Sequence, residues 1–571
     1  MDSGPTPSYN LGARFFEAAR IYADQPALGI AGDDSCLTYQ RLGEKVLETA
    51  VFLGRLHSGE PVGILSENRP EWCQVYLAIV TSGGMVVPVD AQLKTEELTR
   101  VFDDSGFSKV FVSPRYLDVA RKVAGEIARP IEIINIEAIP DRAKGEFAPA
   151  FAADPDSPAV MIFTSGTTGR PKKVILTHRN IISNIEGVIR RLPFGPGDRF
   201  LSVLPLHHTF EATCGFLTPL LHGCCVHYVK TINSREIMEG VKKHRTTHFI
   251  AVPLLYEKLY HGIMNAVKKA PLTRRVTIQV LMAFTRFVYS ATGISLGKKL
   301  FRSLREKAGL GSIRLMVSGG APLPLEVSQN FTLMGFDFVE GYGMTETSPV
   351  ISVNPPEKIK FGSVGPPLEN IRVKIDEPNE NGIGEVLVQG PSITPGYLGN
   401  LDATAELIRN GWLHTGDMGR LDKDGYLYIR GRRKNVIVSA AGKNIYPEEI
   451  EAALMVSPLV MEAMVWGKKA ESGREEVAAM IYPDFDALSQ RLGRERDGIG
   501  EDEIKNMLDP EVKAVCDRMA DYKRVKHVVY LRQELEKTSS KKIKRFIYHN
   551  GDHKEHPALD QRELRHPRHH E

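Results

Sequence analysis

The sequence predicts an α/β protein with a large N-terminal domain and a smaller second α/β domain. Three observations lead to this fold class. Strand and helix patterns alternate over about the first 340 residues, and short strands separated by turns follow after about Gly365. A charged break at Gly431–Lys434 then precedes a further stretch with its own strand and helix patterns. Alternating elements favour mixed, mostly parallel sheets, and the short strands favour a β-meander or barrel-like part.

The first elements that the pattern predicts alternate regularly. They are a strand at 61–66, a helix at 71–79, a strand at 84–89 and a helix at 93–104. Strand, helix and strand at this spacing indicate βαβ units, whose strands are parallel.

A loop rich in glycine and threonine comes next, between two expected strands at 159–163 and 174–176. A helix is expected from about Asn180, because Ile181, Ile182, Ile185, Val188 and Ile189 recur at helical spacing. The loop is therefore expected to join two strands, in the manner of a flap.

The later elements are short. Strands are expected at 384–390, 418–421 and 426–429, with an Asp-Lys-Asp-Gly turn between the last two. A helix is expected from Pro447, since proline and acidic residues suit a first helical turn. Residues 549–571 hold six of the 17 histidines, and we expect a disordered tail there, with metal binding as an alternative.

Composition excludes several classes of protein. The 571 residues are 42% hydrophobic and 25% charged, which is typical of globular chains. The net charge is only +3, so the general basic field of a nucleic-acid-binding protein is missing. No signal peptide is evident at the N-terminus, and no apolar stretch reaches the ~20 residues of a spanning helix. We expect a cytoplasmic protein.

The cysteines give no motif. Six of them lie scattered at positions 36, 73, 214, 224, 225 and 516, without a CxxC pair. This spacing predicts neither a metal site nor a disulfide framework, and reduced, buried thiols are expected instead.

The densest chemical signal is the segment Thr164–Lys173. It contains two glycines, four hydroxyl side chains and three cations, a combination that suits a polyphosphate. It lacks the GxxxxGK[ST] spacing of a Walker loop, and a strand rather than a helix follows it. The alternative is a polar hairpin turn without a ligand.

This segment resembles the TSGTTGxPKG signature of the adenylate-forming superfamily, which includes acyl-CoA synthetases, adenylation domains and luciferases. Further motifs of that superfamily follow in its order, with lysine in place of the usual glycine at positions 173 and 541. They are Leu204–His208, Gly319–Pro322, Gly341–Glu346, Trp412–Asp417, Gly431–Lys434 with Gly442–Ile450, and Lys537–Arg545. The resemblance implies a domain over residues 1–431, a hinge at 432–434 and a mobile lid domain over 435–548.

The resemblance also implies two half-reactions. A carboxylate attacks the α-phosphate of ATP to give an acyl-adenylate and pyrophosphate, and a thiol then takes the acyl group and releases AMP. Lys542 is the implied catalytic lysine of the first step, because a compact ammonium can bridge carboxylate and phosphate oxygens. Glu346 is the implied Mg²⁺ ligand, Thr345 a donor to the α-phosphate, and His208 a residue near the carboxylate.

The other implied site residues bind the nucleotide or serve the second step. Tyr342 offers a face to adenine, Asp417 accepts from the ribose hydroxyls, and Arg432 reaches ribose or phosphate. Lys434 is the implied hinge residue. The remaining nucleotide contacts are Thr164, Ser165, Gly166, Thr167, Thr168, Gly169, Lys172, Gly320, Ala321, Pro322, Gly341 and Gly343, and the CoA channel holds Gly442 and Lys443.

The acid substrate is expected to be a fatty acid, because the motif sequences taken together are most similar to those of bacterial long-chain fatty acyl-CoA synthetases. Residues 272–305 carry seven Lys or Arg and no acid among apolar residues, which suits an anionic lipid surface. A peripheral contact with the inner face of the membrane is therefore a further expectation. The alternative for this segment is a core helix with a solvated basic face.

Other functions remain open at this point. The chain could acylate acyl carrier protein instead of CoA, stop at the acyl-adenylate, or use a shorter or aryl acid. An inert membrane-associated scaffold on the same fold is a further alternative, which the presence of Glu346, Asp417 and Lys542 opposes.

Overall fold

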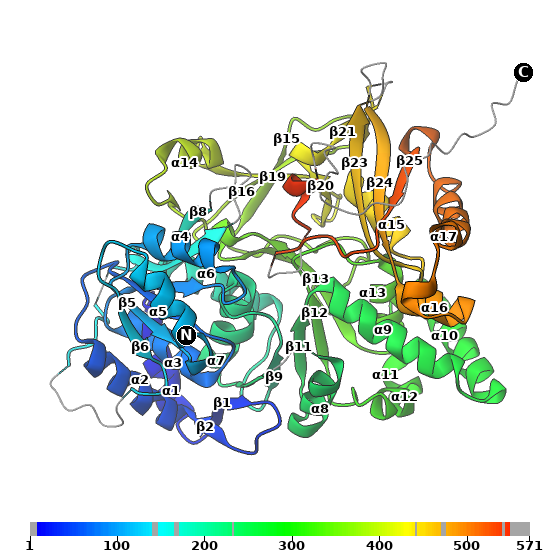
Figure 1. The fold of residues 1–571 in the computed structure, drawn as a ribbon. Coiled ribbons are helices and arrows are strands. Elements are labelled where there is room, and N and C mark those ends of the chain that lie inside the picture. Colours follow the sequence, from blue (N-terminus) through cyan, green and yellow to red (C-terminus); the bar gives the residue numbers. More distant parts are fainter. Residues whose placement is uncertain are drawn as a thin grey trace, which may run out of the picture.

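A computed structural model describes residues 8–139, 147–152, 154–164, 171–230, 233–439, 442–469, 475–538 and 543–548 (Figure 1). Two large sheets lie side by side, and a smaller sheet and the C-terminal elements lie above them in this view. The α/β fold class with mixed parallel sheets is confirmed.

One large sheet has seven strands. They are β3 (Pro61–Leu65), β4 (Met85–Val89), β5 (Lys109–Val112), β6 (Glu132–Asn135), β7 (Pro158–Thr164), β8 (Lys172–Thr177) and β17 (Gly396–Tyr397). The order is β17-β8-β7-β4-β3-β5-β6, and only the pairs made by β8 are antiparallel. The expected strand–helix–strand pattern over residues 61–104 is confirmed.

The other large sheet has eight strands. They are β1 (Pro26–Ile30), β2 (Cys36–Thr38), β9 (Arg199–Ser202), β10 (Cys225–Tyr228), β11 (His248–Ala251), β12 (Leu315–Ser318), β13 (Asp337–Gly343) and β14 (Val350–Val353). The order is β14-β13-β12-β11-β9-β10-β1-β2, parallel except for an antiparallel strand at each edge.

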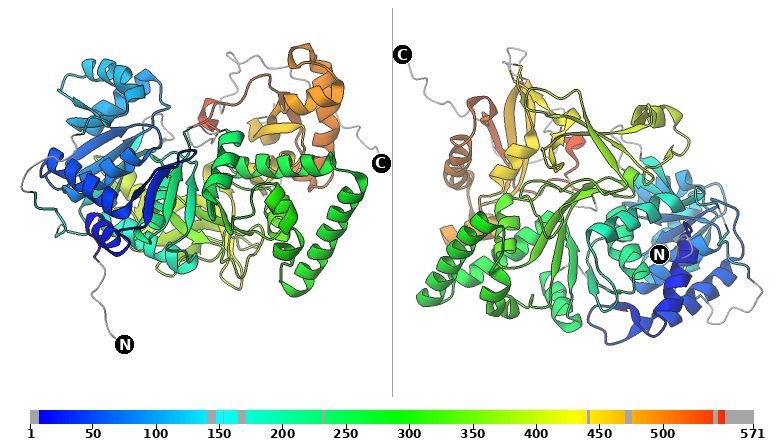
Figure 2. Two further views of the ribbon diagram at one scale, coloured as in Figure 1. Left: turned by 90° about the horizontal axis from the view of Figure 1, so that it is seen from below. Right: turned by 180° about the vertical axis from the view of Figure 1, so that it is seen from behind.

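Helices cover these sheets (Figure 2). Those up to residue 221 are α1 (Leu11–Ile21), α2 (Tyr39–Leu53), α3 (Pro70–Thr81), α4 (Thr95–Ser105), α5 (Leu117–Gly125), α6 (His178–Arg191), the π-helix η2 (Glu211–Leu217) and α7 (Thr218–Leu221). Those that follow are α8 (Ser234–His244), α9 (Pro253–Lys268), α10 (Leu272–Thr292), α11 (Gly297–Leu300), α12 (Arg302–Lys307) and α13 (Leu325–Leu333).

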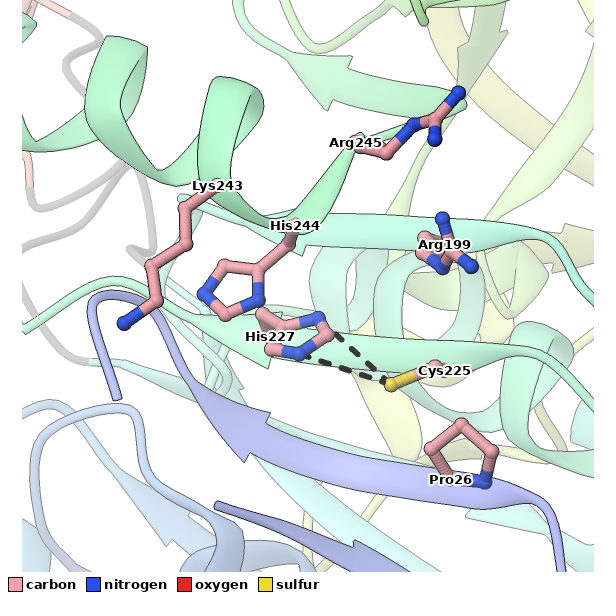
Figure 3. Close-up of a pocket in the computed structure, with 7 residues that line it drawn as sticks. All are labelled: Pro26, Arg199, Cys225, His227, Lys243, His244 and Arg245. Atoms are coloured by element: carbon pink, nitrogen blue, oxygen red, sulfur yellow. Dashed lines mark hydrogen bonds between the residues drawn. The ribbon is translucent and has the colours of Figure 1, made fainter. Parts of the chain in front are cut away.

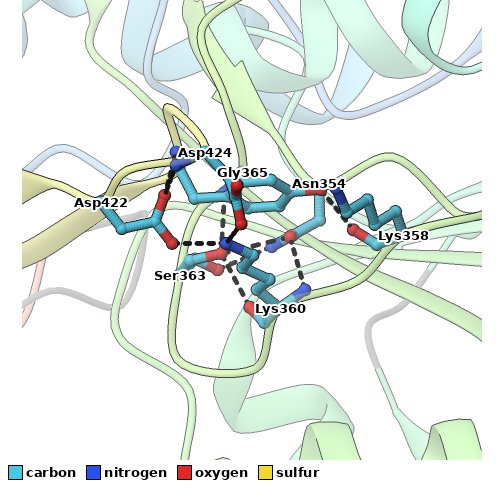
Figure 4. A network of polar contacts seen from close by, with 8 residues as sticks. Asn354, Lys358, Lys360, Ser363, Gly365, Asp422 and Asp424 are labelled. Atoms are coloured by element: carbon cyan, nitrogen blue, oxygen red, sulfur yellow. Dashed lines mark hydrogen bonds and ion pairs between the residues drawn. The ribbon is translucent and has the colours of Figure 1, made fainter. Parts of the chain in front are cut away.

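A third sheet forms the expected β-meander. Its elements are β15 (Arg372–Asp376), β16 (Gly384–Gln389), α14 (Leu401–Leu407), β18 (Ile408–Arg409), β19 (Trp412–Leu421) and β20 (Leu427–Arg432), and all its pairs are antiparallel. Ion pairs connect the turn between β19 and β20 to the loop after β14 (Figure 4). Lys360 lies 2.6 Å from both Asp422 and Asp424, and its ammonium lies over the ring of Tyr426.

The last part of the chain has a core of its own. Its elements are β21 (Ile437–Val438), β22 (Asn444–Ile445), α15 (Pro447–Leu454), β23 (Val460–Lys469), β24 (Glu475–Pro483), α16 (Phe485–Leu492), α17 (Glu501–Cys516) and β25 (His527–Tyr530). Their buried apolar residues, from Ile437 to Tyr548, form one cluster, whereas two other clusters fill the preceding sheets. The expected tail at 549–571 lies outside the described residues, and the domain limits at 431 and 435 stay predictions.

Helix α10 projects at the rim of the body (Figures 1 and 2). Thr285 is the only residue of α10 that is buried, and Phe287 is 70% exposed. Ile278, Leu281 and Met282 pack partly buried against the main core cluster, so the alternative of a core helix with a solvated basic face stays a prediction. Within the described ranges, no helix combines the length and the apolar character that crossing a bilayer requires.

Candidate functional site

The segment Thr164–Lys173, here called the phosphate segment, lies between two antiparallel strands. Thr164 at the end of β7 pairs with Lys172 at the start of β8, so the segment joins strand to strand as expected. The Lys172 ammonium lies 4.6 Å from the centre of the Tyr397 ring. Ser165, Gly166, Thr167, Thr168 and Gly169 lie outside the described residues.

Glu346 lies in a short 3-10 turn, η3 (Thr345–Thr347), which follows β13. Its side chain is buried, and its Oε1 accepts a 2.7 Å hydrogen bond from the Tyr397 hydroxyl. Thr345 is half-buried beside it. Lys172, Tyr397 and Glu346 therefore form a continuous chain of contacts between the phosphate segment and the end of β13.

A second group of polar side chains lies on neighbouring strands. Asp417 of β19 pairs in register with Arg432 of β20, and the Arg432 Nε lies 2.8 Å from Asp417 Oδ1. Tyr342 of β13 donates from its hydroxyl to Asp417 Oδ2 at 2.5 Å. Burial raises the pKa of the Tyr342 phenol well above its usual value, and the Asp417 charge adds to that rise.

Arg432 connects the two groups. Burial by itself lowers the pKa of its guanidinium, but the charge of Asp417, followed by Tyr342 and Glu346, raises it overall. The charge of the same guanidinium opposes the rise that burial causes in the pKa of Tyr397, and the guanidinium donates a 3.1 Å hydrogen bond to the Thr415 carbonyl oxygen. Asp417 is thus ion-paired to a permanent cation, and the buried Glu346 acts electrostatically on the same guanidinium, an arrangement of carboxylates that suits hydroxyl groups or a hard metal ion.

The residues of the Gly319–Pro322 motif follow β12, next to β13. Since Ser318 pairs with Glu340, this loop begins beside Gly341 and Tyr342. Gly320, Ala321 and Pro322 are exposed there, and Gly343 is exposed at the end of β13.

His208 belongs to the turn after β9 that leads into η2. Its ring centre lies 4.2 Å from that of His207, whose Nε2 is 3.5 Å from Asp90 Oδ1. Burial lowers the pKa of His207. His208 thus stacks on its neighbour in the chain, and its backbone is hydrogen-bonded to Pro205 and Ala212 of the same segment.

The expected hinge residues lie between β20 and α15. Glu448 at the start of α15 accepts from the Arg432 backbone N–H at 3.5 Å and from Asn435 Nδ2 at 2.8 Å. Burial lowers the pKa of Lys434, and the charges of Arg432 and Arg545 lower it further. Lys434 is therefore close to both Arg432 and Arg545 of the C-terminal lysine motif.

Lys542 lies outside the described residues, but its flanks do not. Lys537 and Ile543 form an isolated β-bridge on its two sides. Lys544 lies 3.9 Å from Glu97 of α4, and Arg545 forms an ion pair with Glu451 of α15. The end of the motif thus reaches from the small C-terminal core to α4 of the N-terminal body.

The expected CoA-channel residues lie elsewhere. Gly442 and Lys443 belong to the turn between β21 and β22, and the Lys443 ammonium lies 4.8 Å from the centre of the Tyr522 ring. Their contacts are within the C-terminal core, so the structure does not bring them to Asp417 or Glu346.

Sequence reasoning missed Glu211, at the start of η2. It is 1% exposed, and neither carboxylate oxygen has a hydrogen-bond partner in the part of the chain that the structure describes. Burial raises its pKa to about 8, a rise that the nearby Ser202 hydroxyl opposes. The signal available was a single acid at the head of the otherwise uncharged stretch 211–221.

Comparison with known proteins gives consistent matches. Residues 15–398 match the model described as AMP-binding enzyme, and residues 449–542 match the AMP-binding enzyme C-terminal domain. The chain is 30% identical over 544 residues to a 2-succinylbenzoate–CoA ligase of Bacillus mycoides, covering 93% of this chain and 96% of that one. It is 30% identical over 528 residues to a peroxisomal long chain acyl-CoA synthetase of Arabidopsis thaliana, covering 85% and 74%.

Solved structures share the fold. The O-succinylbenzoate coenzyme A synthetase of Bacillus subtilis in complex with AMP superposes with a TM-score of 0.72 at 25% identity, covering 94% of this chain and 97% of that one. ATP-bound MatB of Rhodopseudomonas palustris gives a TM-score of 0.74 at 24% identity, covering 96% and 99%, which supports the fold alone.

Proposed function

The chain belongs to the AMP-binding enzyme family and is an ATP-using, AMP-forming acyl- or aryl-CoA ligase, and from this premise we propose that its acid substrate is a long-chain fatty acid. The resemblance drawn from the motifs is confirmed at the level of the superfamily. The proposal goes further, because the relatives include both an Arabidopsis long chain acyl-CoA synthetase and a feruloyl-CoA synthase of Amycolatopsis at 28% identity.

The observation that carries the ligase chemistry is the Asp417–Arg432 ion pair, together with the electrostatic effect of the buried Glu346 on the same guanidinium. In our proposal Asp417 accepts from the ribose hydroxyls, and Tyr342 presents its ring to adenine. The loop Gly320–Pro322, together with Gly341 and Gly343, borders the adenine.

The phosphate groups fall to the other side of the site. Thr164–Gly169 and Lys172 enclose the β- and γ-phosphates through backbone N–H groups, hydroxyls and charge, and Thr345 donates to the α-phosphate. Glu346 holds Mg²⁺, which suits a buried carboxylate oxygen and supplies positive charge to the phosphates when it is bound. His208 lies toward the acyl carboxylate.

We assign the adenylation step to Lys542, whose ammonium stabilises the charge that moves between carboxylate and α-phosphate. The position of its flanks supports this role, because Lys544 already reaches α4 of the N-terminal body. Lys542→Ala should nearly abolish acyl-AMP formation and leave thioester formation from supplied acyl-AMP largely intact. Lys541→Ala is the matched control, and equal loss of both half-reactions in Lys542→Ala would contradict the assignment.

For the second half-reaction we propose that the unit from residue 435 to 548 turns about 432–434 and brings Gly442 and Lys443 to the thiol channel. The hydrogen bond from the Arg432 backbone N–H to Glu448 must then rearrange, whereas the one from Asn435 to Glu448 lies within the moving unit. Lys434→Pro fixes one φ angle at this point and should slow thioester formation more than adenylation. The reverse order of effects would count against the hinge.

One screen tests the substrate. Pyrophosphate release is measured with acids of graded chain length and with ferulic and succinylbenzoic acids, each with and without CoA. A long-chain optimum with CoA consumption is expected. An aryl or short-chain optimum would replace the substrate assignment, and acylation of carrier protein instead of CoA would replace the acceptor.

We also propose that α10 and the residues after it contact an anionic membrane, where long-chain acids partition. The exposed apolar side chains of α10 recur at nearly every fourth residue, at Leu272, Val276, Val280, Phe284 and Phe287. No acid occurs between residues 272 and 305, and Arg274, Arg275, Lys298 and Lys299 are exposed. This pattern is typical of helices that lie in a membrane interface.

Flotation with vesicles separates this contact from other ones. Salt-sensitive binding to anionic vesicles is expected, together with its loss in Phe284→Ser/Phe287→Ser. The same substitutions should leave pyrophosphate release with a dissolved acid unchanged. Binding to neutral vesicles alone, or none, would remove the proposal.

A further inference from the structure

A cluster of two cysteines and two histidines lies near the β2 edge of the eight-stranded sheet. Figure 3 shows Cys225, His227 and His244 of this cluster. Cys36 Sγ lies 3.5 Å from Cys225 Sγ, and Cys225 Sγ lies 3.7 Å and 3.9 Å from the two ring nitrogens of His227. The ligand atoms of these three residues all lie within 4.8 Å of one another. His244 stacks on His227 with 3.7 Å between ring centres.

The sheet builds this cluster from distant parts of the chain. Cys225 and His227 are two residues apart on β10, so their side chains share one face of the sheet. Gly29 of β1 pairs with His227 on one side and with Cys36 of β2 on the other. The three side chains therefore converge over β1.

Gly29 provides the space for this convergence. A Cβ added there would lie 3.0 Å from His227 Cδ2 and 3.4 Å from Cys36 Sγ. Any larger residue would push these two side chains apart. The backbone of β1 at Gly29 thus borders a small space, and the Cys36 sulfur and the His227 imidazole lie on its other sides.

The distances fit a tetrahedral metal ion better than a disulfide. Zn–S bonds of about 2.3 Å place two sulfur ligands roughly 3.8 Å apart, close to the 3.5 Å between Cys36 Sγ and Cys225 Sγ. A disulfide requires Cα atoms closer than about 7 Å. Cys36 and Cys225 lie on strands with β1 between them, and two strand spacings of about 4.8 Å exceed that limit.

The electrostatic surroundings suit the ligand forms of these groups. Arg199 pairs in register with Cys225, and Lys243, His244 and Arg245 line the same pocket. Positive charge of this kind favours thiolates, which are the metal-binding form of cysteine.

We propose that Cys36, Cys225 and His227 bind a thiophilic cation, Zn²⁺, with a fourth position open to the pocket beside Lys243. Two thiolates and a neutral imidazole balance the charge of Zn²⁺ in a region that is otherwise basic. The separation of the two cysteines by 189 residues explains why their spacing predicted no metal site.

The test uses the full chain and Co²⁺ as a spectroscopic probe for the zinc position. Tetrahedral Co²⁺ bound to thiolate gives a sulfur-to-cobalt charge-transfer band, which the histidines of residues 549–571 cannot produce. We expect this band at one equivalent of Co²⁺, its displacement by Zn²⁺, and at least tenfold weaker binding in Cys36→Ala and Cys225→Ala.

Cys224→Ala is the matched control, because the thiol next to Cys225 points away and contacts the Gly195 carbonyl oxygen. It should keep the band, and Gly29→Val should lose it. Absence of the band in the unmodified chain would overturn the proposal without reliance on any variant. A band that survives in Cys225→Ala would also overturn it.

Discussion

Two regions of the N-terminal body bury carboxylates in opposite ways. Asp417 is held between Arg432 and Tyr342, whereas Glu211 is more deeply buried and neither of its oxygens has a described hydrogen-bond partner. The first arrangement stabilises a charge, and the second favours the neutral acid, with a pKa of about 8. Burial alone therefore does not distinguish a partnered carboxylate from an isolated one, whereas a matched cation and a hydroxyl donor do.

The largest effect on activity should come from Asp417→Asn, which removes the charge of the ion-paired carboxylate. It leaves Arg432 without its ion-pair partner and replaces charge-assisted hydrogen bonds with neutral ones. A fall of about 10–100-fold in kcat/KM for ATP is expected in pyrophosphate-release assays. Asp424→Asn, in the turn of the same hairpin, should have little effect. A change below about threefold for Asp417→Asn would mean that this carboxylate does not bind the nucleotide.

Glu211→Gln tests the second arrangement, the buried acid without an ion-pair partner. Since the folded pKa of about 8 exceeds the ordinary value of 4.5, the stabilisation from a neutral Glu211 is complete below pH 4.5. It is lost progressively as the pH rises through 8. Relative to the unmodified chain, Glu211→Gln should gain several degrees in apparent melting temperature between pH 5.5 and pH 8.5.

Glu44→Gln, at an exposed site on α2, should show no such gain. Parallel pH profiles of the unmodified chain and Glu211→Gln would mean that Glu211 is ionised in the fold. The carboxyl lies over Gly215, where an added Cβ would be 2.3 Å from Oε1, so Gly215→Ala should disturb the same turn of the π-helix.

The smallest effect is expected for Lys360→Met, which removes the fastening of the β19–β20 turn in Figure 4. These ion pairs are partly exposed and exchange with water, so their net contribution is small. A decrease of about 1–2 °C in apparent melting temperature at low salt, disappearing at high salt, is expected. An equal decrease at high salt would show that packing of Lys360 on Tyr426, rather than charge, matters here.

The elements of the first half of the chain could be predicted because their patterns are local. The helices α3 and α4 and the pair β7–β8 follow from apolar spacing within windows of a few residues. The order of strands could not be predicted in this way, since the pairing of β17 with β8 joins residues more than 200 positions apart.

The candidate site shows the same division. Tyr342, Glu346, Asp417 and Arg432 were found through motifs, and the structure brings them together. Tyr397 and Glu211 carry no motif, and their relevance arises only from three-dimensional neighbours. The cysteine–histidine cluster is the extreme case, because each of its strands looks ordinary and only the bare Gly29 between them creates the space.

The contact of Tyr397 with both Glu346 and Lys172 has a mechanical consequence. An ion bound at Glu346 would share this carboxylate with the Tyr397 hydroxyl, and any shift of the tyrosine ring would also move the surface on which the Lys172 ammonium rests. A change at the carboxylate would thus reach β8, the strand that begins at Lys172. Tyr397 therefore couples the carboxylate of Glu346 to the ammonium of Lys172. Tyr397→Phe removes the hydroxyl and would uncouple these two groups while leaving each in place.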